Sequence, residues 1–409
     1  MSKPSVWIDA TNSIAGMRLW GMTIVERQIR EFSLIGIVYF KVFVRKRDLD
    51  HIGQIRTDFS RLYSVEIDWI CVTGVQDFWE DVGGANEPLI LIAGDTIYDE
   101  RVLVHVFNEG PGIMISSTSR SVCHINANQC VAFSKLGIDS WELLESKVLF
   151  LVALRPEDLD QYVPSLRLKM PAFIICAAEC ESAQTIENHM FQRTFKGAID
   201  VVARYGYYHL VRWLTRWLVE KSISPNTYTV LSVLCVWIAS PFLASGWIGT
   251  GLVLAWFGVI LDSVDGKLAR LRLHLSDTMG DLEHFAATPG LALWFVSVGW
   301  HLSGGNLLDW SSETLVSGSL IILFVMDKII SGLFKYCVGR ELFDYQRIDT
   351  LFHLFAARRN IALMTFSIGA LVGCLAQSYE LFLGWMAITF IVHFIRAGWI
   401  LRKSLFCRR

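Results

Sequence analysis

The sequence has no surplus of positive charge. Its 37 Lys and Arg side chains are balanced by 39 Asp and Glu side chains, which gives a formal net charge of -2. A protein that binds nucleic acid concentrates positive charge to neutralise phosphates, so this balance argues against such a partner. Nine cysteines are scattered without the spacing of a metal site or a disulfide framework, and Cys176 and Cys180 are the only close pair. This usage is typical of a reducing, cytosolic environment.

The N-terminus lacks the apolar segment of a secretory signal. Residues 1–5 lead directly into a strand-like run, so we expect no secretory peptide. The whole chain is nevertheless apolar, with 53% hydrophobic residues and a mean hydropathy of +0.41. These residues gather in the second half of the 409-residue chain, which is long enough for two domains. We therefore predict that the second half is embedded in a membrane.

In the first half, short apolar runs alternate with polar, helix-like stretches up to about residue 180. Residues 24–32 have helical periodicity. Strands are predicted at residues 6–8, 38–44, 65–70, 89–93 and 173–176. This alternation of strand and helix predicts a Rossmann-like, three-layer α/β domain with a parallel sheet.

In the second half, six apolar segments are each near the roughly 20 residues that a bilayer requires. They lie at residues 228–247, 249–270, 279–302, 313–335, 361–379 and 381–401. The loops around residues 302–314 and 375–379 contain no Lys or Arg, whereas the opposite ends of the spans are rich in both. The positive-inside rule therefore predicts an all-α domain of six transmembrane helices in a bacterial-type inner or plasma membrane, with both termini in the cytosol.

A segment rich in cationic and aromatic residues joins the two halves. From residue 192 to residue 221 the pattern predicts an amphipathic helix in the membrane interface, in contact with membrane lipids. Its marker residues are Arg204, Tyr205, Tyr207, Tyr208, Arg212, Trp213, Arg216 and Trp217. The predicted parts are therefore an α/β domain at 1–190, a juxtamembrane helix at 191–224 and a membrane domain at 225–409.

Two carboxylates interrupt the second predicted span near its cytosolic end. On a helix, Asp262, Asp265, Gly266, Ala269 and Arg270 stand at i, i+3, i+4, i+7 and i+8 and share one face. Charge inside a span indicates function. The carboxylates suit Mg²⁺ (or Mn²⁺), which binds carboxylate and phosphate oxygens together, and the small residues leave room for a ligand. The alternative, a charge cluster facing water, has no need of the small residues.

These residues resemble the signature of the CDP-alcohol phosphotransferases, D-x-x-D-G-x-x-A-R followed by G-x-x-x-D-x-x-x-D. Residues 262–270 match the first half in full. If Gly280 is the glycine of the second half, His284 and Thr288 replace its aspartates. A shifted register keeps Asp277 and Asp281 as the pair but places Leu273 at the glycine. In either register these four residues form one helical stripe, on which Asp281 can supply the missing carboxylate.

The resemblance implies an integral membrane transferase of phospholipid or related phosphodiester synthesis. An acceptor hydroxyl, on a lipid alcohol or a polyol phosphate, would attack the phosphorus of a CDP-linked donor and release CMP. The metal would be held by Asp262, Asp265 and Asp281. Gly266, Ala269 and Gly280 would admit the nucleotide, and Arg270 would bind phosphate or brace the carboxylates. Many relatives are homodimers.

The resemblance also implies a base and an acceptor site. A threonine hydroxyl does not deprotonate near neutral pH, so Thr288 cannot replace the family's last aspartate as base. His284 can, with Asp281 beside it. Arg358 and Arg359 stand where basic residues of the family contact the acceptor phosphate. The alternative is that these arginines anchor the topology.

The first half resembles the sugar-phosphate nucleotidyltransferases, whose glycine-rich loop ends in G-x-R-L. Here that loop is residues 13–19, with Ile14 in place of a loop glycine, and the usual Pro-Lys segment is absent. Asp95, after Gly94, corresponds to the family's metal-binding aspartate. We expect the fold to be kept and nucleotidyl transfer to be lost. An ordinary turn between strand and helix would also explain Gly16.

Two other functions follow from the same residues. Because both signatures are incomplete, the chain could be a non-catalytic membrane scaffold or a subunit that binds CDP-alcohols. The complete stripe at residues 262–270 favours a transferase, since a protein without a nucleotide to bind has no physical reason to keep charge in a span. A transporter is disfavoured, because the charges lie at a helix end and not near the midplane.

Overall fold

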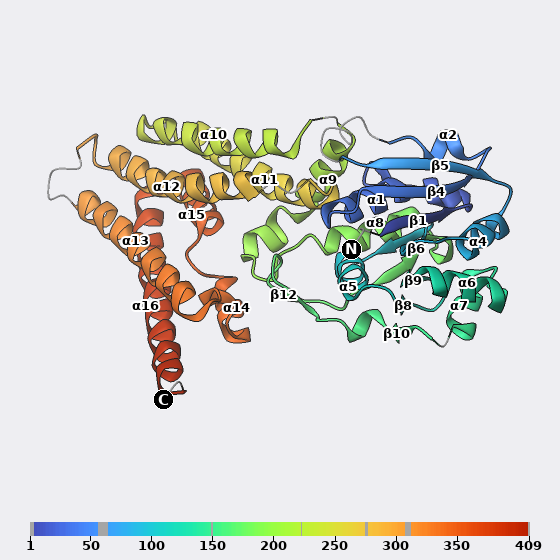
Figure 1. Ribbon diagram of the computed structural model, residues 1–409. Helices are drawn as coiled ribbons and strands as arrows, with labels where there is room; N and C mark the ends of the chain where they lie inside the picture. Colours follow the sequence, from blue (N-terminus) through green and yellow to red (C-terminus); the bar gives the residue numbers. More distant parts are fainter. Residues whose placement is uncertain are drawn as a thin grey trace. The chain divides into compact units, whose positions relative to one another are not determined.

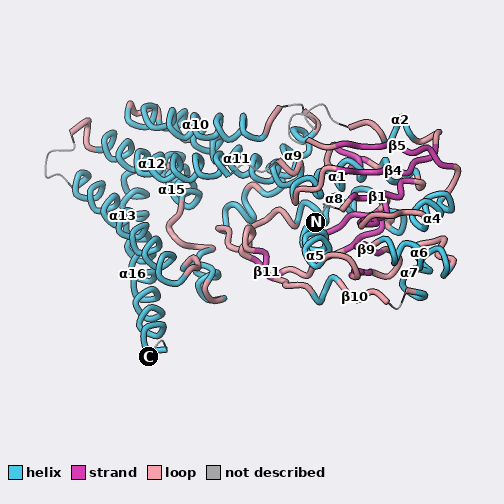
Figure 2. The backbone as a smooth tube through the Cα atoms, in the orientation of Figure 1, coloured by secondary structure: helices cyan, strands magenta, loops and turns pink. Residues whose placement is uncertain are grey.

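A computed structural model shows two compact units (Figure 1). It describes residues 4–55, 64–148, 150–221, 223–274, 277–306 and 312–407, without the side chains of residues 145, 277, 280–284, 287 and 403–407. The first unit comprises Met1–Pro164, Lys169–Phe195 and Leu271–Leu273, and the second comprises Ser165–Leu168, Lys196–Arg270 and His274–Arg409. The large sheet belongs to the first unit and the long helices to the second (Figure 2).

The first unit is built on a seven-stranded sheet of order β10-β8-β9-β6-β1-β4-β5. Its strands are β1 (Ser5–Ala10), β4 (Tyr39–Arg45), β5 (Glu66–Val72), β6 (Leu89–Ala93), β8 (Ile113–Ser116), β9 (Ser121–Ile125) and β10 (Val152–Leu154). The interior strand β1 pairs in parallel with β4 and β6, so that Ile8 lies opposite Val42 and Ile92. The four strands predicted for the sheet at residues 6–8, 38–44, 65–70 and 89–93 are confirmed.

The prediction of a parallel sheet is wrong for β9, which is antiparallel to both β6 and β8. Strands β8 and β9 are joined by a tight turn, in which the Ser117 amide donates to the Arg120 carbonyl at 2.9 Å. So short a connection permits only an antiparallel pair. The run at residues 173–176 forms β13 (Ile174–Cys176), which pairs with β7 (Thr96–Tyr98) outside the main sheet. The remaining strand pairs are β2 (Arg18–Leu19) with β3 (Met22–Thr23), and β11 (Tyr162–Val163) with β12 (Leu168–Lys169).

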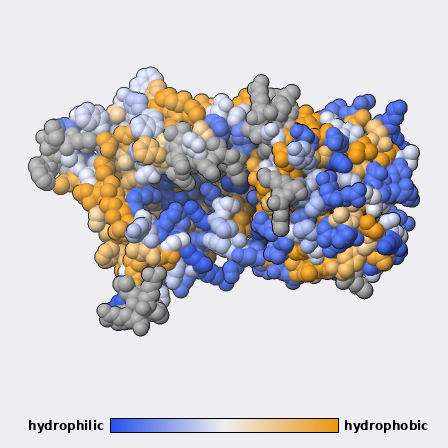
Figure 3. Space-filling model, viewed as in Figure 1, coloured by the Kyte–Doolittle hydropathy of each residue, from blue (hydrophilic) through white to orange (hydrophobic). Residues whose placement is uncertain are grey.

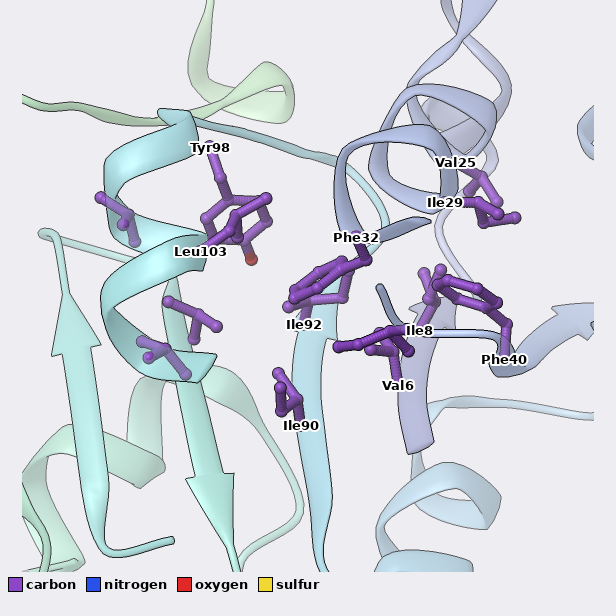
Figure 4. Close-up of a cluster of buried hydrophobic side chains, with 14 of the residues drawn as sticks. Val6, Ile8, Val25, Ile29, Phe32, Phe40, Ile90, Ile92, Tyr98 and Leu103 are labelled. Atoms are coloured by element: carbon purple, nitrogen blue, oxygen red, sulfur yellow. The ribbon is translucent and has the colours of Figure 1, made fainter. Parts of the chain in front are cut away.

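Helices cover both faces of the sheet and complete the predicted three layers. On one face, α1 (Ile24–Leu34) and α5 (Glu100–Glu109) bury Val25, Ile29, Phe32 and Leu103 against β1 and β6 (Figure 4). On the other face, α4 (Val75–Gly83), α6 (Ala127–Leu136) and α7 (Trp141–Lys147) bury a second, aromatic core. The short α2 (Leu49–Ile52) and α8 (Ala183–Gln192) complete the unit. The helix predicted at residues 24–32 is α1.

The second unit is a bundle of helices. They are α9 (Tyr208–Val219), α10 (Pro225–Ala244), α11 (Ile248–Leu271), α12 (Asp277–Leu302), α13 (Ser312–Val338), α14 (Arg347–His353), α15 (Arg359–Leu371) and α16 (Leu375–Cys407). In the described part of the chain, α10, α11, α13 and α16 are long and apolar enough to cross a membrane. Hydrophobic residues gather on the exposed surface of the helical unit (Figure 3). Ile322 and Leu333 on α13 and Phe394 on α16 are among the exposed ones.

The fifth predicted span, residues 361–379, is not one helix. The chain leaves the helical conformation between Leu371 and Leu375, and Gly373 has a φ of +72°. Helix α15 has only 13 residues, too few to cross a bilayer, and α16 begins inside the predicted span. Hydropathy missed the break because apolar residues flank Gly373 on both sides. The predicted count of six spans is therefore not confirmed.

Candidate functional site

Helix α11 carries the predicted stripe on one face. Asp265 is only 2% exposed, whereas Asp262, Gly266, Ala269 and Arg270 are partly exposed. A Cβ atom placed on Gly266 would lie 3.5 Å from Nη2 of Arg270, so the Arg270 side chain folds back along the helix over Gly266. Residues four apart meet in this way on a helix surface. The arrangement places a guanidinium on the same helix face as the two carboxylates and against Gly266, where a Cβ would make only an ordinary contact.

The Asp265 carboxylate fits a cation site. No described residue donates to either oxygen within 3.5 Å, and the Thr229 hydroxyl and the Gly266 amide interact with the carboxylate only at longer range. A buried carboxylate without a partner is costly, whereas a metal ion supplies both charge and coordination. The described residues hold no group of three His, Cys, Asp or Glu side chains that could bind a metal. A full ligand set therefore needs a residue beyond Asp262 and Asp265, such as the predicted Asp281.

The predicted residues of α12 are placed only by their backbone. Asp277, Asp281, His284 and Thr288 lie in the first turns of this helix and share the predicted stripe. Thr288 is exposed, whereas Gly280, Asp281 and His284 lie outside the described side chains. Their roles as nucleotide contact, ligand and base stay predictions.

The two arginines at the start of α15 have different partners. Arg359 forms an ion pair with Asp262 on α11. Arg358 is the N-cap residue of α15, and its Nη1 donates to Nε2 of His353 at 2.6 Å. Burial, together with the Arg358 charge, lowers the pKa of His353 to about 2, so this imidazole accepts a hydrogen bond as a neutral group. Of these two arginines, Arg359 is the one that contacts a predicted metal ligand.

Four residues that the sequence analysis did not assign to the site complete this region. Tyr207 Oη lies 3.3 Å from Ser263 Oγ on α11 and accepts from Asn360 Nδ2 on α15 at 3.0 Å. The same Nδ2 atom donates to Asp200 Oδ2 at 2.7 Å. Asp200 and Asn360 carry no motif that would have marked them, because each pairs with a residue far away in the chain.

The prediction of one amphipathic helix over residues 192–221 is wrong in its extent. Helix α8 ends at Gln192, and α9 begins only at Tyr208, after a π-helical turn at Val202–Gly206. The Asp200 carboxylate accepts from the Ala203 amide in this turn at 2.9 Å. Tyr205 and Trp213 are exposed as predicted, but Tyr207 is buried with 8% exposure. The turn directs Tyr207 into the bundle.

In the first unit, Asp95 lies at the end of β6, where the resemblance predicted a metal ligand. Arg120 binds both of its carboxylate oxygens, with Nε to Oδ1 at 3.0 Å and Nη2 to Oδ2 at 2.9 Å. Asn12 Nδ2 also donates to Oδ2 at 3.0 Å. In the predicted phosphate loop, a Cβ atom on Gly16 would lie 2.5 Å from the His51 ring. The carboxylate and the loop are thus both in contact with other side chains.

We expect Arg120→Met to destabilise the first unit by about 3–5 kcal/mol, because it leaves Asp95 charged and buried without its counterion. Asp95 and Arg120 have side chains that are 4% and 14% exposed. Amide hydrogen exchange of β6 and β9 in the full chain measures the loss locally. The double variant Asp95→Asn/Arg120→Met should recover most of it. A loss below about 1 kcal/mol for Arg120→Met would show that the pair is not structural.

Residues 222–393 match the model of the family described as CDP-alcohol phosphatidyltransferase. No curated protein matches the chain. Among solved structures, phosphatidylinositol phosphate synthase (PgsA1) of Mycobacterium tuberculosis with CDP-DAG bound is 16% identical, and the match covers 46% of this chain and 94% of that one, with a TM-score of 0.36. A Bacillus anthracis protein described as a glucose-1-phosphate thymidylyltransferase, in complex with a sucrose, is 10% identical, with 46% and 95% covered and a TM-score of 0.31.

With TM-scores below 0.5, neither solved structure bears on the geometry of the site. The family match defines the class: residues 222–393 are a CDP-alcohol phosphatidyltransferase domain, and the helical part of the chain is a membrane transferase. This confirms the family that the stripe at residues 262–270 indicated.

Proposed function

We propose that the protein is a membrane CDP-alcohol phosphotransferase of phospholipid or related phosphodiester synthesis. It transfers a substituted phosphate from a CDP-linked donor to a lipid alcohol or a polyol phosphate and releases CMP. The observation that carries this proposal is the Asp265 carboxylate, buried in an apolar helix without a hydrogen-bond partner among the described residues. A cation bound there would stabilise such a group, and Asp262 and Arg270 share its helix face.

In this proposal Asp262, Asp265 and Asp281 would hold Mg²⁺ (or Mn²⁺), which would stabilise charge on the phosphoryl oxygens. Phosphoryl transfer depends on positioning and electrostatics more than on covalent chemistry. Arg270 and Arg359 bind phosphate oxygens. These five residues would lie on α11, α12 and α15.

A proton must leave the acceptor hydroxyl as it attacks the phosphorus. We assign this step to His284, with Asp281 as the second candidate, because Thr288 cannot act as a base. Gly266, Ala269 and Gly280 leave space for the cytidine nucleotide.

The first unit is proposed to have lost nucleotidyl transfer. Support comes from Asp95, which is bound by Arg120 and Asn12, and from Ile14, which stands in place of a loop glycine. The parts proposed are an α/β domain at 1–190, a juxtamembrane segment at 191–224 and a membrane domain at 225–409. The site and both termini face the cytosol, and a homodimer is the proposed assembly.

The test is CMP release by the purified protein in lipid, with Mg²⁺ or Mn²⁺, across a panel of CDP-alcohols and acceptors. CMP that requires both an acceptor and the metal would establish the transferase and name its donor. Binding of CDP-alcohols without CMP from any pair would establish instead the scaffold or binding subunit that the incomplete signatures leave open.

Gly266→Ala should separate folding from nucleotide binding. The added Cβ would be 3.5 Å from Arg270, an ordinary contact, and alanine is about 1 kcal/mol more favourable than glycine inside a helix. We therefore expect an unchanged or higher unfolding temperature. The KM for the CDP-linked donor should rise roughly tenfold or more, because the methyl group occupies space meant for the nucleotide. Gly332→Ala, on α13 with open space around its Cβ, is the control that should leave KM unchanged. Equal KM values for both variants would contradict a nucleotide contact at Gly266.

A further inference from the structure

A chain of hydrogen bonds runs beside the ion pair between Asp262 and Arg359. Ser263 follows Asp262 on α11, and Asn360 follows Arg359 on α15. Tyr207 bridges this second pair, since its Oη lies 3.3 Å from Ser263 Oγ and accepts from Asn360 Nδ2 at 3.0 Å. Two consecutive residue pairs of α11 and α15 are therefore joined, one directly and the other through Tyr207.

Asp200 accepts a second hydrogen bond from the side-chain amide nitrogen of Asn360. Its Oδ2 accepts from Asn360 Nδ2 at 2.7 Å, and its Oδ1 accepts from the Ala203 amide at 2.9 Å. Asp200 is 4% exposed and Asn360 is 7% exposed. Because an amide nitrogen has two hydrogens, Asn360 satisfies Asp200 and Tyr207 together. Both contacts restrict the Asn360 side chain, and through it the first turn of α15.

We infer that Asp200, Tyr207 and Asn360, here called the Tyr207 clamp, are positioning residues that hold Arg359 against Asp262. The inference rests on the proposed function. Hydrogen bonds behind a metal ligand or its counterion fix the orientation of that group, and a buried network does so more rigidly than a single bond. None of the three residues needs to touch a substrate in this role.

The tyrosine of the clamp stays protonated in the physiological pH range. Burial raises the pKa of Tyr207 to about 12, even though its hydrogen bond with Ser263 opposes that shift. The phenol therefore keeps its proton wherever the enzyme works. A change in the clamp is expected to alter the level of activity without moving its pH profile.

Loosening the clamp should have opposite effects on two measurements. Arg359 and a divalent cation compete for the Asp262 carboxylate, so a less firmly held Arg359 should let the cation bind more tightly. A less firmly held Arg359 is also poorly placed to bind phosphate, so the rate of CMP formation should fall. General damage to the bundle would instead lower both the affinity for the cation and the rate of CMP formation.

The experiment measures Mn²⁺ affinity by the EPR signal of free Mn²⁺, in the purified full chain with no other ligand. Tyr207→Phe and Asn360→Ala should raise the affinity severalfold, in line with the loss of one buried hydrogen bond, and lower kcat on the order of tenfold. Tyr379→Phe is the matched control, because it also removes the hydroxyl of a buried tyrosine, one that donates to the Phe295 carbonyl at 2.7 Å and joins α16 to α12. It should change neither quantity. In an Arg359→Gln background, Tyr207→Phe should have no further effect on Mn²⁺ binding.

An unchanged or weaker Mn²⁺ affinity in Tyr207→Phe and Asn360→Ala would overturn the clamp, as would effects that add to those of Arg359→Gln. If Asp265→Asn binds Mn²⁺ as the wild type does, the metal site itself is absent and both proposals fall. If the Mn²⁺ results are as expected but no pair of substrates yields CMP, the transferase proposal fails and the clamp stands.

Discussion

Asp265→Asn is expected to lower CMP formation by roughly a thousandfold, because metal stabilisation of a phosphoryl transition state provides several kcal/mol and each 1.36 kcal/mol is about a factor of ten. The amide nitrogen that replaces one carboxylate oxygen cannot ligate a cation. The unfolding temperature should not fall, since Asp265 loses no hydrogen bond to any described residue and a neutral amide costs less to bury than a carboxylate. Activity and stability thus respond in different ways.

Asp327→Asn is the matched control for this prediction. Asp327 is also a buried aspartate of a membrane helix, but its Oδ1 lies 2.6 Å from Nδ1 of His393, and the two helices involved, α13 and α16, carry none of the proposed site residues. Its replacement should lower the unfolding temperature and leave CMP formation within a fewfold of wild type. If Asp265→Asn retains more than about a tenth of the activity, Asp265 is not a metal ligand and the site must be reassigned.

The parts of the fold that the sequence predicted correctly have local signals. Strand β1 and its parallel neighbours are continuous apolar runs, and the stripe from Asp262 to Arg270 repeats with the period of one helix. Strand β9 was missed because its direction depends on a turn of a few residues, not on its own composition. The break at Gly373 was missed because hydropathy does not register backbone conformation.

The same distinction holds for the site. Asp262 and Asp265 could be found because a carboxylate in a span is unusual wherever it occurs. Tyr207 was predicted to face the membrane interface along with its aromatic neighbours, and its burial depends on a π-helical turn. Its partner Asn360 lies 153 residues away in the chain. A single sequence contains no signal that joins two such positions, so only the fold shows them as one group.

The largest effect expected on α12 is that of His284→Ala, which should reduce CMP formation by about 10²–10⁴-fold, the usual contribution of a general base. A base acts when it is unprotonated, and an unperturbed imidazole has a pKa of about 6.5. The rate should therefore fall about tenfold per pH unit below that value. If Asp281 is the base, with an ordinary carboxyl pKa of about 3.9, the rate should stay level down to about pH 5.

The pH profile of kcat for wild type, His284→Ala and His284→Asp decides between these two residues. His284→Asp restores the carboxylate of the family signature, so it should recover much of the activity lost in His284→Ala, with the fall in rate moved to lower pH. Thr288→Val, one turn further along the same stripe and exposed, should behave as wild type, because the threonine hydroxyl takes no part in proton transfer. Full activity in His284→Ala would remove His284 from the mechanism. If the wild-type rate also stays level down to about pH 5, Asp281 is the base that accepts the proton.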